Sequence, residues 1–462
     1  MIRTTFEHAE SKSTDLTSQN AYASQRIQPI SLSESVVWYS IVGTYGVYCL
    51  GGLYLLSPAL GWILLAYALK RQWDHYRQGD SAYPITMHWL LWLWVGGMAV
   101  ELLALVVGHQ NFDLSTTVTI KSAIGWAKGW ALLAIFPVIG YCLPIRPQLL
   151  YRAACVVALQ SLILAPFLYA AYLADLGPLL YTSPLKILGG AGDLFFQVRL
   201  YSLDGEGNAR WAFFCPWGPA GGMMGNIYFF LALQERNTRW KLVGLAGSFL
   251  MVWMSKSRMA TLFWLAILLV SWIIPRIRRP KTLFTLGFSS LLGGISAPVI
   301  ESLTWNYWQD FHATRASSSR VRNVLQRIAL RRWWNEAPIW GHGTVDPGPH
   351  LVANMPIGSH HTIFGLLFVK GLVGLVAFLI PMISTVVYLL FKSQTRATAA
   401  TALSIILILC CYTQGEGLDG LVYLFWPGLI LVGIALHSEQ AEREQEILLK
   451  STQLEGPQLQ NT

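Results

Sequence analysis

The chain has 462 residues, of which 54% are hydrophobic and 12% are charged, and its formal charge is +9. Soluble domains contain roughly 25% charged residues, so this composition excludes an ordinary soluble enzyme and indicates that lipid is the solvent. The positive charge does not predict a nucleic-acid partner, because basic loops are what orients a membrane protein. Six cysteines lie within or beside apolar segments without paired spacing, so neither a disulfide framework nor a zinc site is expected.

Both ends of the chain are polar. Residues 1–34 are rich in Ser, Thr and Gln and lack a short apolar region followed by an A-x-A site, so no cleaved signal peptide is expected. Residues 438–462 are rich in Glu and Gln and predict a short helix. We therefore expect a cytoplasmic N-terminal segment, a transmembrane domain over 35–437 and a cytoplasmic tail.

Apolar runs of about bilayer-spanning length recur between these ends and predict an all-α polytopic membrane protein. About twelve transmembrane helices are expected, at 36–55, 57–70, 88–107, 121–143, 152–174, 212–234, 240–254, 259–275, 282–303, 361–390, 398–413 and 421–437. The first two are separated by Ser57 and Pro58, which form either a tight turn or a kink in one long helix.

Basic residues in short loops predict the orientation of these helices. Five basic loops alternate with loops of low charge, and the positive-inside rule places all five in the cytoplasm. They contain Lys70, Arg71 and Arg77; Arg146 and Arg152; Arg236, Arg239 and Lys241; Arg276, Arg278, Arg279 and Lys281; and Lys392 and Arg396. Both termini are then cytoplasmic, and two long loops, at about 175–211 and 304–360, lie outside. Arg258 ends the sequence SKSR between two of the cytoplasmic loops, so it must lie at the outer membrane boundary.

The second outer loop concentrates groups that bind anions. Together with His361 it contains six Arg and five of the ten His of the chain. Ser317–Ser319 offer a helix N-cap, and a helical apolar stripe follows and ends before Pro338. The stripe consists of Val321, Val324, Leu325, Ile328 and Ala329. We expect an interfacial helix that lies on the membrane with its Arg on anionic headgroups. Alternatively, some of these Arg face a cavity and grip a diphosphate, whose oxygens a planar guanidinium binds bidentately.

Four further side chains are candidates for a site. Arg258 at the membrane edge is costly and is either functional or snorkels to the interface. Arg210 precedes a predicted helix, where a flanking Arg is ordinary. His360 and His361 lie where the loop re-enters the membrane, and a neutral imidazole can accept a proton from a sugar hydroxyl near pH 7. Alternatively, they are helix-start residues that hydrogen-bond locally. Adjacent residues lie on different helix faces, so at most one is expected to point into a site.

Acidic residues give weaker indications. Asp204 and Glu206 resemble a divalent-metal pair, but short acidic pairs are common in loops, and no His spacing is typical of a metal site. Glu416 and Asp419 could line a cavity, or they are solvated acids of a glycine-rich turn. We therefore expect no metal and no cofactor.

The order of these motifs resembles the O-antigen ligase / O-antigen polymerase superfamily of bacterial polysaccharide-assembly membrane proteins. The motifs lie within about residues 205–380, and the topology extends the resemblance to the whole chain. The similar segments are Arg210 before FFCPWGPAGGMMGN, SKSR ending at Arg258, SSR ending at Arg320, EAPIWGHG at Glu336–Gly343, and His360 followed by Gly371 and Gly374. His361 stands where the family usually has Asn or Ser. Either histidine could therefore be the working residue, and the register favours His360.

The resemblance implies a C-type glycosyltransferase architecture in the cytoplasmic (inner) membrane of a bacterium, with the active site facing the periplasm or exterior. It implies a glycan donor linked to a polyprenyl diphosphate such as undecaprenyl diphosphate. Arg258 and Arg320 would bind the diphosphate, with Arg210 a lesser candidate, and the remaining Arg of the loop would be membrane-surface charge. His360 would activate the acceptor hydroxyl, and transfer would invert the anomeric carbon without a metal. A diphosphate leaves readily, so cations, a base and a dry cavity suffice, and paired carboxylates are not required.

Three functions remain open. A ligase would use lipid A-core or another lipid as acceptor, whereas a polymerase would use a second lipid-linked glycan. The S-x-S-R and H-x10-G-x-x-G likeness favours the ligase. A transporter of lipid-linked glycans would show internal repeats and ionisable groups near mid-helix. No repeat is evident, and Glu101 is the main acid within a predicted span, with Lys128 the occasional base.

Overall fold

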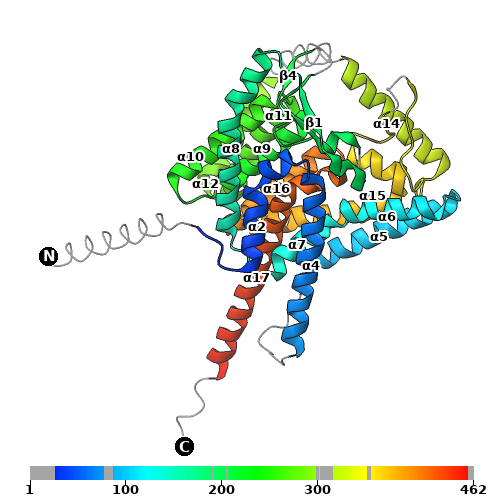
Figure 1. The fold of residues 1–462 in the computed structure, drawn as a ribbon. Helices are drawn as coiled ribbons and strands as arrows, with labels where there is room; N and C mark the ends of the chain where they lie inside the picture. The colour runs from blue at the N-terminus through cyan, green and yellow to red at the C-terminus, as the bar shows by residue number, and fades with distance from the viewer. Residues whose placement is uncertain are drawn as a thin grey trace, which may run out of the picture.

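The computed structural model describes residues 27–77, 87–189, 192–203, 207–297, 301, 316–350 and 355–455. Side chains are described for all of these except residues 75, 316–320 and 438–455. Within this part of the chain, seven helical segments are long and apolar enough to cross a membrane. The protein is therefore a helical polytopic membrane protein, and Figure 1 shows that helices form nearly all of it.

Helices make up most of the described elements. The helices are α2 (Leu32–Val42), α3 (Thr44–Cys49), α4 (Leu53–Arg77), α5 (Trp89–Asn111), α6 (Thr116–Lys128), α7 (Leu132–Cys142), α8 (Pro147–Leu173), α9 (Gly218–Ala232), α10 (Thr238–Met254), α11 (Arg258–Ile273), α12 (Pro280–Ile295), α14 (Ala316–Glu336), α15 (Thr362–Lys392), α16 (Ala397–Tyr412) and α17 (Leu418–Glu455). Short 3-10 helices are η1 (Pro184–Leu188), η2 (Asp193–Phe196) and η3 (Ile274–Arg276). Strand β1 (Leu179–Thr182) pairs antiparallel with β2 (Gln197–Arg199), and β3 (Ser202–Leu203) with β4 (Ala209–Arg210).

The first two predicted helices do form a hairpin, but its turn is not at Ser57 and Pro58. Pro58 lies inside α4, and the chain reverses at residues 50–52, where Gly51 has a φ of +69°. A Cβ at Gly51 would lie 2.2 Å from Cβ of Ser183, so only glycine fits this turn. The turn thus packs against the first of the two loops predicted to lie outside.

The predicted span at 121–143 is broken in the structure. Gly129 and its neighbours separate α6 from α7. A Cβ at Gly129 would lie 2.9 Å from the carbonyl oxygen of Asp419, so the break packs directly on the start of α17. Hydropathy alone could not locate this break, because both halves are apolar.

A second interruption lies within α15. Gly371 has φ 64° and ψ −162°, and the loop at 338–343 hydrogen-bonds to the interrupted turn. His342 N donates to the carbonyl oxygen of Phe368 (2.9 Å) and Gly343 N to that of Val369 (2.8 Å). A Cβ at Gly341 would lie 2.5 Å from backbone nitrogens of α15, which explains the glycines of the EAPIWGHG segment structurally.

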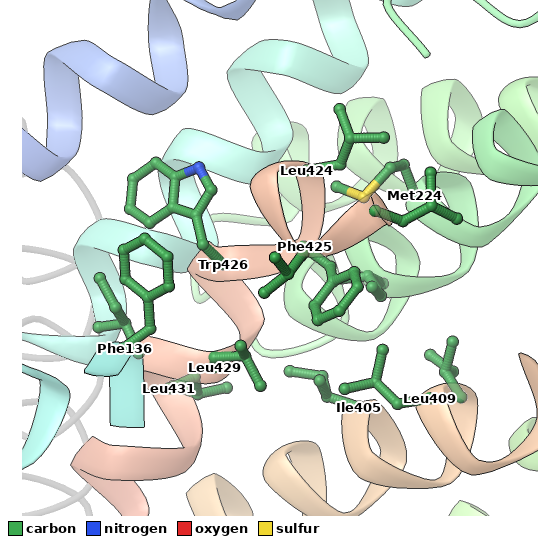
Figure 2. Close-up of a cluster of buried hydrophobic side chains, with 14 of the residues drawn as sticks. Phe136, Met224, Ile405, Leu409, Leu424, Phe425, Trp426, Leu429 and Leu431 are labelled. Atoms are coloured by element: carbon green, nitrogen blue, oxygen red, sulfur yellow. The ribbon is translucent and has the colours of Figure 1, made fainter. Parts of the chain in front are cut away.

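The core surrounds the first half of α17, where nearly every residue over Leu418–His437 is buried. It packs against α4, α7, α9 and α16. Figure 2 shows side chains where α17 meets α7, α9 and α16, among which the rings of Phe136 and Trp426 stack with centroids 5.4 Å apart. α17 is therefore the central helix of the fold (Figure 1).

The helix predicted after Ser317–Ser319 is α14. Within its apolar stripe Leu325 and Ala329 are fully buried, and Ala329 packs with Ile357 and with Phe368 of α15. Part of the stripe therefore contacts protein, and its other members Val321, Val324 and Ile328 are half-buried. Figure 1 shows α14 beside the first half of α15.

Candidate active site

The sequence Ser255–Arg258 forms the tight turn between α10 and α11. The hydroxyl of Ser255 donates to the carbonyl oxygen of Val252 (2.7 Å) and accepts from the backbone N–H of Ser257 (3.2 Å). Ser257 is the N-cap of α11, and its hydroxyl accepts from Ala260 N (3.3 Å). Each serine thus satisfies backbone groups at a helix end, and this arrangement fixes the next residue, Arg258, at the first position of α11.

Arg258 and Lys256 border an open groove of about 780 Å³ between α8, α10 and α11. The rest of its wall is mostly apolar and aromatic, formed by Leu162, Ala165, Pro166, Tyr169, Trp211, Leu250, Trp253, Met254 and Thr261. Lys256 Nζ lies 5.6 Å from the ring centroid of Trp211. The groove therefore combines an apolar surface with two cations beside a helix N-terminus, a combination that suits an amphipathic anion.

Arg210 reaches the same turn from a different element. It ends β4, and the following residue, Trp211, donates its backbone N–H to the carbonyl oxygen of Met254 (3.2 Å). A Cβ at Gly218 would lie 3.6 Å from Cδ of Arg210 and 2.9 Å from the carbonyl oxygen of Ser255. The glycine at the start of α9 thus leaves room for the carbonyl of Ser255, and Arg210 lies beside the same glycine.

A second turn, at residues 413–418, lies next to the first. Met259, directly after Arg258, packs on Gly415, where a Cβ would lie 2.7 Å from its Sδ. The turn is fixed to the start of α15 through Thr362, whose hydroxyl donates to the carbonyl oxygen of Glu416 (2.6 Å) and accepts from Leu418 N (3.1 Å). These contacts join the segments before α11, α15 and α17 into one unit.

Glu416 is buried in this unit, with 1% of its surface exposed, so it is not a solvated acid of a glycine-rich turn. Its Oε2 accepts from the indole N–H of Trp217 (2.8 Å), the N-cap residue of α9, whereas its Oε1 is buried without a hydrogen-bond partner among the described residues. Burial raises the pKa of the Glu416 carboxyl to about 7, although the Arg322 charge and the Trp217 hydrogen bond act in the opposite direction. Such a carboxyl exchanges a proton near neutral pH.

Arg322 is the described guanidinium that faces Glu416. It is half-buried on α14, and its Nη1 lies 3.7 Å from the position that a Cβ at Gly415 would occupy. The expectation that every Arg of this loop other than Arg320 is membrane-surface charge is therefore wrong for Arg322. The helix rotates by 100° per residue, so sequence spacing alone could not show which Arg turns inward.

His360 and His361 lie beside the same guanidinium. Burial and then the positive charge of Arg322 lower the pKa of His360 below its ordinary 6.5. Burial also lowers the pKa of His361, where a hydrogen bond to Gln414 acts in the opposite direction. His361 is the N-cap of α15 and only 5% exposed, while His360 is half-buried and has a left-handed φ of 62°. Both imidazoles are thus neutral near pH 7, and His360 has the better access from outside.

The structure brings the segments of the predicted site residues together only in part. Arg210 and Arg258 meet at the Ser255–Arg258 turn, and the histidines meet at the neighbouring 413–418 turn. Arg320 lies in α14, but its side chain is outside the described residues, and so are Asp204 and Glu206. The sequence alone did not predict that Arg322 and Trp217 belong to this site. The acidic residues of QGEGLDG did indicate that Glu416 could line a cavity.

Metal-binding groups are sparse in the described part of the chain, where no three His, Cys, Asp or Glu side chains are grouped as a metal site requires. No known protein-family model matches the sequence, and no curated protein matches it significantly.

Proposed function

We propose that the protein is an O-antigen ligase-like glycosyltransferase, which moves a glycan from a polyprenyl-diphosphate donor to an acceptor hydroxyl at the outer face of a bacterial cytoplasmic membrane. The observation that carries this proposal is the groove beside Arg258. Its apolar wall suits a polyprenyl chain, and Arg258 and Lys256 supply the cations that a diphosphate needs. The resemblance of the motifs gives the reaction class.

The reaction needs one bond exchange and one proton transfer. The acceptor hydroxyl attacks the anomeric carbon as the bond from that carbon to the diphosphate oxygen breaks, which inverts the configuration. His360 accepts the hydroxyl proton, since its lowered pKa keeps the imidazole neutral at pH 7. Arg258 and Lys256 stabilise the charge that develops on the leaving diphosphate.

Arg322 and Glu416 influence the reaction without contacting the reacting groups. Glu416 is too buried to meet a substrate, and its charge balances that of Arg322. Burial, together with the charge of Arg322, lowers the pKa of the adjacent histidines and so favours their neutral form. We regard both as positioning residues, because they set the charge around His360 without touching the glycan.

The test is reconstitution of the full chain in proteoliposomes with an undecaprenyl-diphosphate-linked glycan and two acceptors, lipid A-core and a second lipid-linked glycan. We expect transfer to lipid A-core, unaffected by a chelator, and loss of transfer in Arg258→Ala. Arg276→Ala, at the other end of the same helical segment, is the matched control and should retain activity. Transfer only to the second lipid-linked glycan would identify a polymerase instead. Movement of the donor across the membrane without transfer would identify a transporter and reject the proposal.

A further inference from the structure

A second cavity, of about 660 Å³, is bordered by Asp419 and Gly420, which follow the 413–418 turn. Its walls come from the α6–α7 break, from α15 at Lys370, and from the start of α17 at Asp419 and Gly420. Leu188 and Gly189 of the first predicted outer loop and residues 343–345 of the second also line it. The cavity therefore faces the same predicted side of the membrane as Arg258, but it is separate from the groove.

Two of the lysines that line the cavity are available to bind an anion. Lys370 pairs with Glu101, its Nζ lies 4.1 Å from the ring centroid of Trp130, and it also interacts electrostatically with Asp419. The charges of Lys370, Glu101 and Asp419 therefore largely neutralise one another. Lys121 and Lys128 of α6 line the cavity as well, and neither forms an ion pair with any described residue. Three lysines and one carboxylate, Asp419, line the cavity, and Glu101 pairs with Lys370 behind its wall, so the cavity favours an anion.

Aromatic side chains give the cavity its second property. Trp126, Trp130 and Tyr54 contribute to its wall, and flat aromatic faces pack well against the apolar faces of sugar rings. Unpaired lysines beside aromatic rings suit a sugar that carries a carboxylate or a phosphate.

The position of the cavity relates it to the transfer site. Tyr54 contacts Phe195 (centroids 5.0 Å apart), Phe195 contacts Trp217 (5.7 Å), and Trp217 hydrogen-bonds to Glu416. Asp419 follows Glu416 by less than one helical turn. We propose that this cavity binds an anionic sugar residue of the glycan acceptor and holds it beside the 413–418 turn. The acceptor role rests on the proposed transferase function, whereas anionic-sugar binding does not.

Binding can be tested without any donor. The full chain in phosphatidylcholine nanodiscs would be titrated with dodecyl β-glucuronide, dodecyl β-glucoside and dodecyl phosphate, with bound ligand counted by native mass spectrometry. We expect the glucuronide to bind at least about ten-fold more tightly than the neutral glucoside, since charge-assisted hydrogen bonds are about twice as strong as neutral ones. The Lys121→Gln/Lys128→Gln variant should lose that preference, and Lys281→Gln, an exposed lysine far along the chain, should keep it.

The outcomes distinguish anionic-sugar binding by the cavity from its proposed role in binding the acceptor. An equal preference in wild type and double variant would overturn the assignment to this cavity. Dodecyl phosphate binding as tightly as the glucuronide would show a lipid-headgroup site instead. In the transfer assay, the double variant should raise KM for an acidic acceptor with kcat and the donor KM unchanged, and unchanged acceptor KM would reject the acceptor role. No transfer by wild type, with the glucuronide still bound, would reject only the proposed transferase function.

Discussion

The indole N–H of Trp217 donates to Glu416 across 2.8 Å, joining the start of α9 to the turn before α17. The two residues are far apart in the sequence, yet their contact places a buried carboxyl behind Arg322 and the two histidines. An ionised carboxylate would rarely be buried so fully, and its burial here raises its pKa to about 7. The charge state of Glu416 is thus set by the fold rather than by solvent.

Glu416→Gln should remove a pH-dependent loss of stability. A carboxyl whose pKa rises from 4.5 to about 7 on folding favours the folded state most below pH 4.5, and it loses that contribution as the pH rises to about 7. The difference corresponds to about 3 kcal/mol. Apparent Tm at a fixed scan rate should therefore fall from pH 4.5 to 7.5 more steeply in wild type than in Glu416→Gln. Parallel Tm curves for the two proteins would contradict the raised pKa.

Arg322→Gln should move the acid limb of the transfer rate to higher pH. The charge of Arg322 contributes to the lowered pKa of His360, so the neutral base persists below pH 6.5 in wild type. Without that charge the imidazole is protonated at higher pH, and activity is lost earlier as the pH falls. Profiles of kcat/KM against pH measure this; Arg322→Lys and the exposed Arg327→Gln are controls that should keep the wild-type limb. An unchanged limb in Arg322→Gln would remove Arg322 from the site.

The backbone of His360 allows the imidazole to be tested apart from local strain. A left-handed φ of 62° costs an L-residue roughly 1–2 kcal/mol, which glycine avoids. His360→Gly and His360→Ala should both lower kcat at least about 100-fold, as loss of a general base does. His360→Gly should have the higher Tm of the two. A larger loss of kcat in His361→Ala than in either variant would move the base to His361.

The sequence could predict those parts of the site that local chemistry determines. Ser255 and Ser257 cap helices, so the position of Arg258 at the start of α11 follows from nearby residues. The helix at Ala316–Glu336 likewise follows from its apolar stripe, but Ser317–Ser319 lie inside its first turn, so the prediction that they form its N-cap is wrong. The topology argument predicted only that Arg258 lies at the outer membrane boundary. It did not predict the contact of the next residue, Met259, with Gly415.

The remaining features depend on long-range contacts. The partner of Glu101 is Lys370, 269 residues later, and periodicity carries no information about such a pair. The α6–α7 break depends on how closely Gly129 approaches Asp419, and the inward turn of Arg322 depends on the rotation of α14. These relationships are set by tertiary packing, so a single sequence cannot supply them.

Gly140 and Gly433 should be intolerant of alanine. They lie where α7 and α17 pack: a Cβ at Gly140 would lie 2.0 Å from the carbonyl oxygen of Ile430, and one at Gly433 2.0 Å from that of Pro137. Small residues allow this approach between membrane helices. Gly140→Ala and Gly433→Ala should each destabilise the fold by about 1–3 kcal/mol, seen as a lower apparent Tm. Gly96→Ala, where a Cβ meets no atom within 4 Å, should not lower Tm, since alanine favours the helix more than glycine does.

The buried pair of Glu101 and Lys370 should behave as one structural unit. Their side chains are at most 2% exposed, and Glu101 Oε1 has no hydrogen-bond partner among the described residues. Lys370→Met leaves an uncompensated buried carboxylate and should destabilise the fold by about 3–5 kcal/mol, while Glu101→Leu/Lys370→Met should recover most of that loss. Lys186→Met, which removes an exposed pair with Asp193, should change stability by at most about 1 kcal/mol.

Apparent Tm and the yield of folded protein from the membrane measure the effect of each variant. If Lys370→Met is as stable as wild type, the pair does not hold α5 against α15. If instead the double variant is no more stable than Lys370→Met, each side chain makes contacts that the other does not share. Recovery in the double variant alone identifies a mutually compensating pair, because two apolar side chains of similar volume leave no charge buried between the helices.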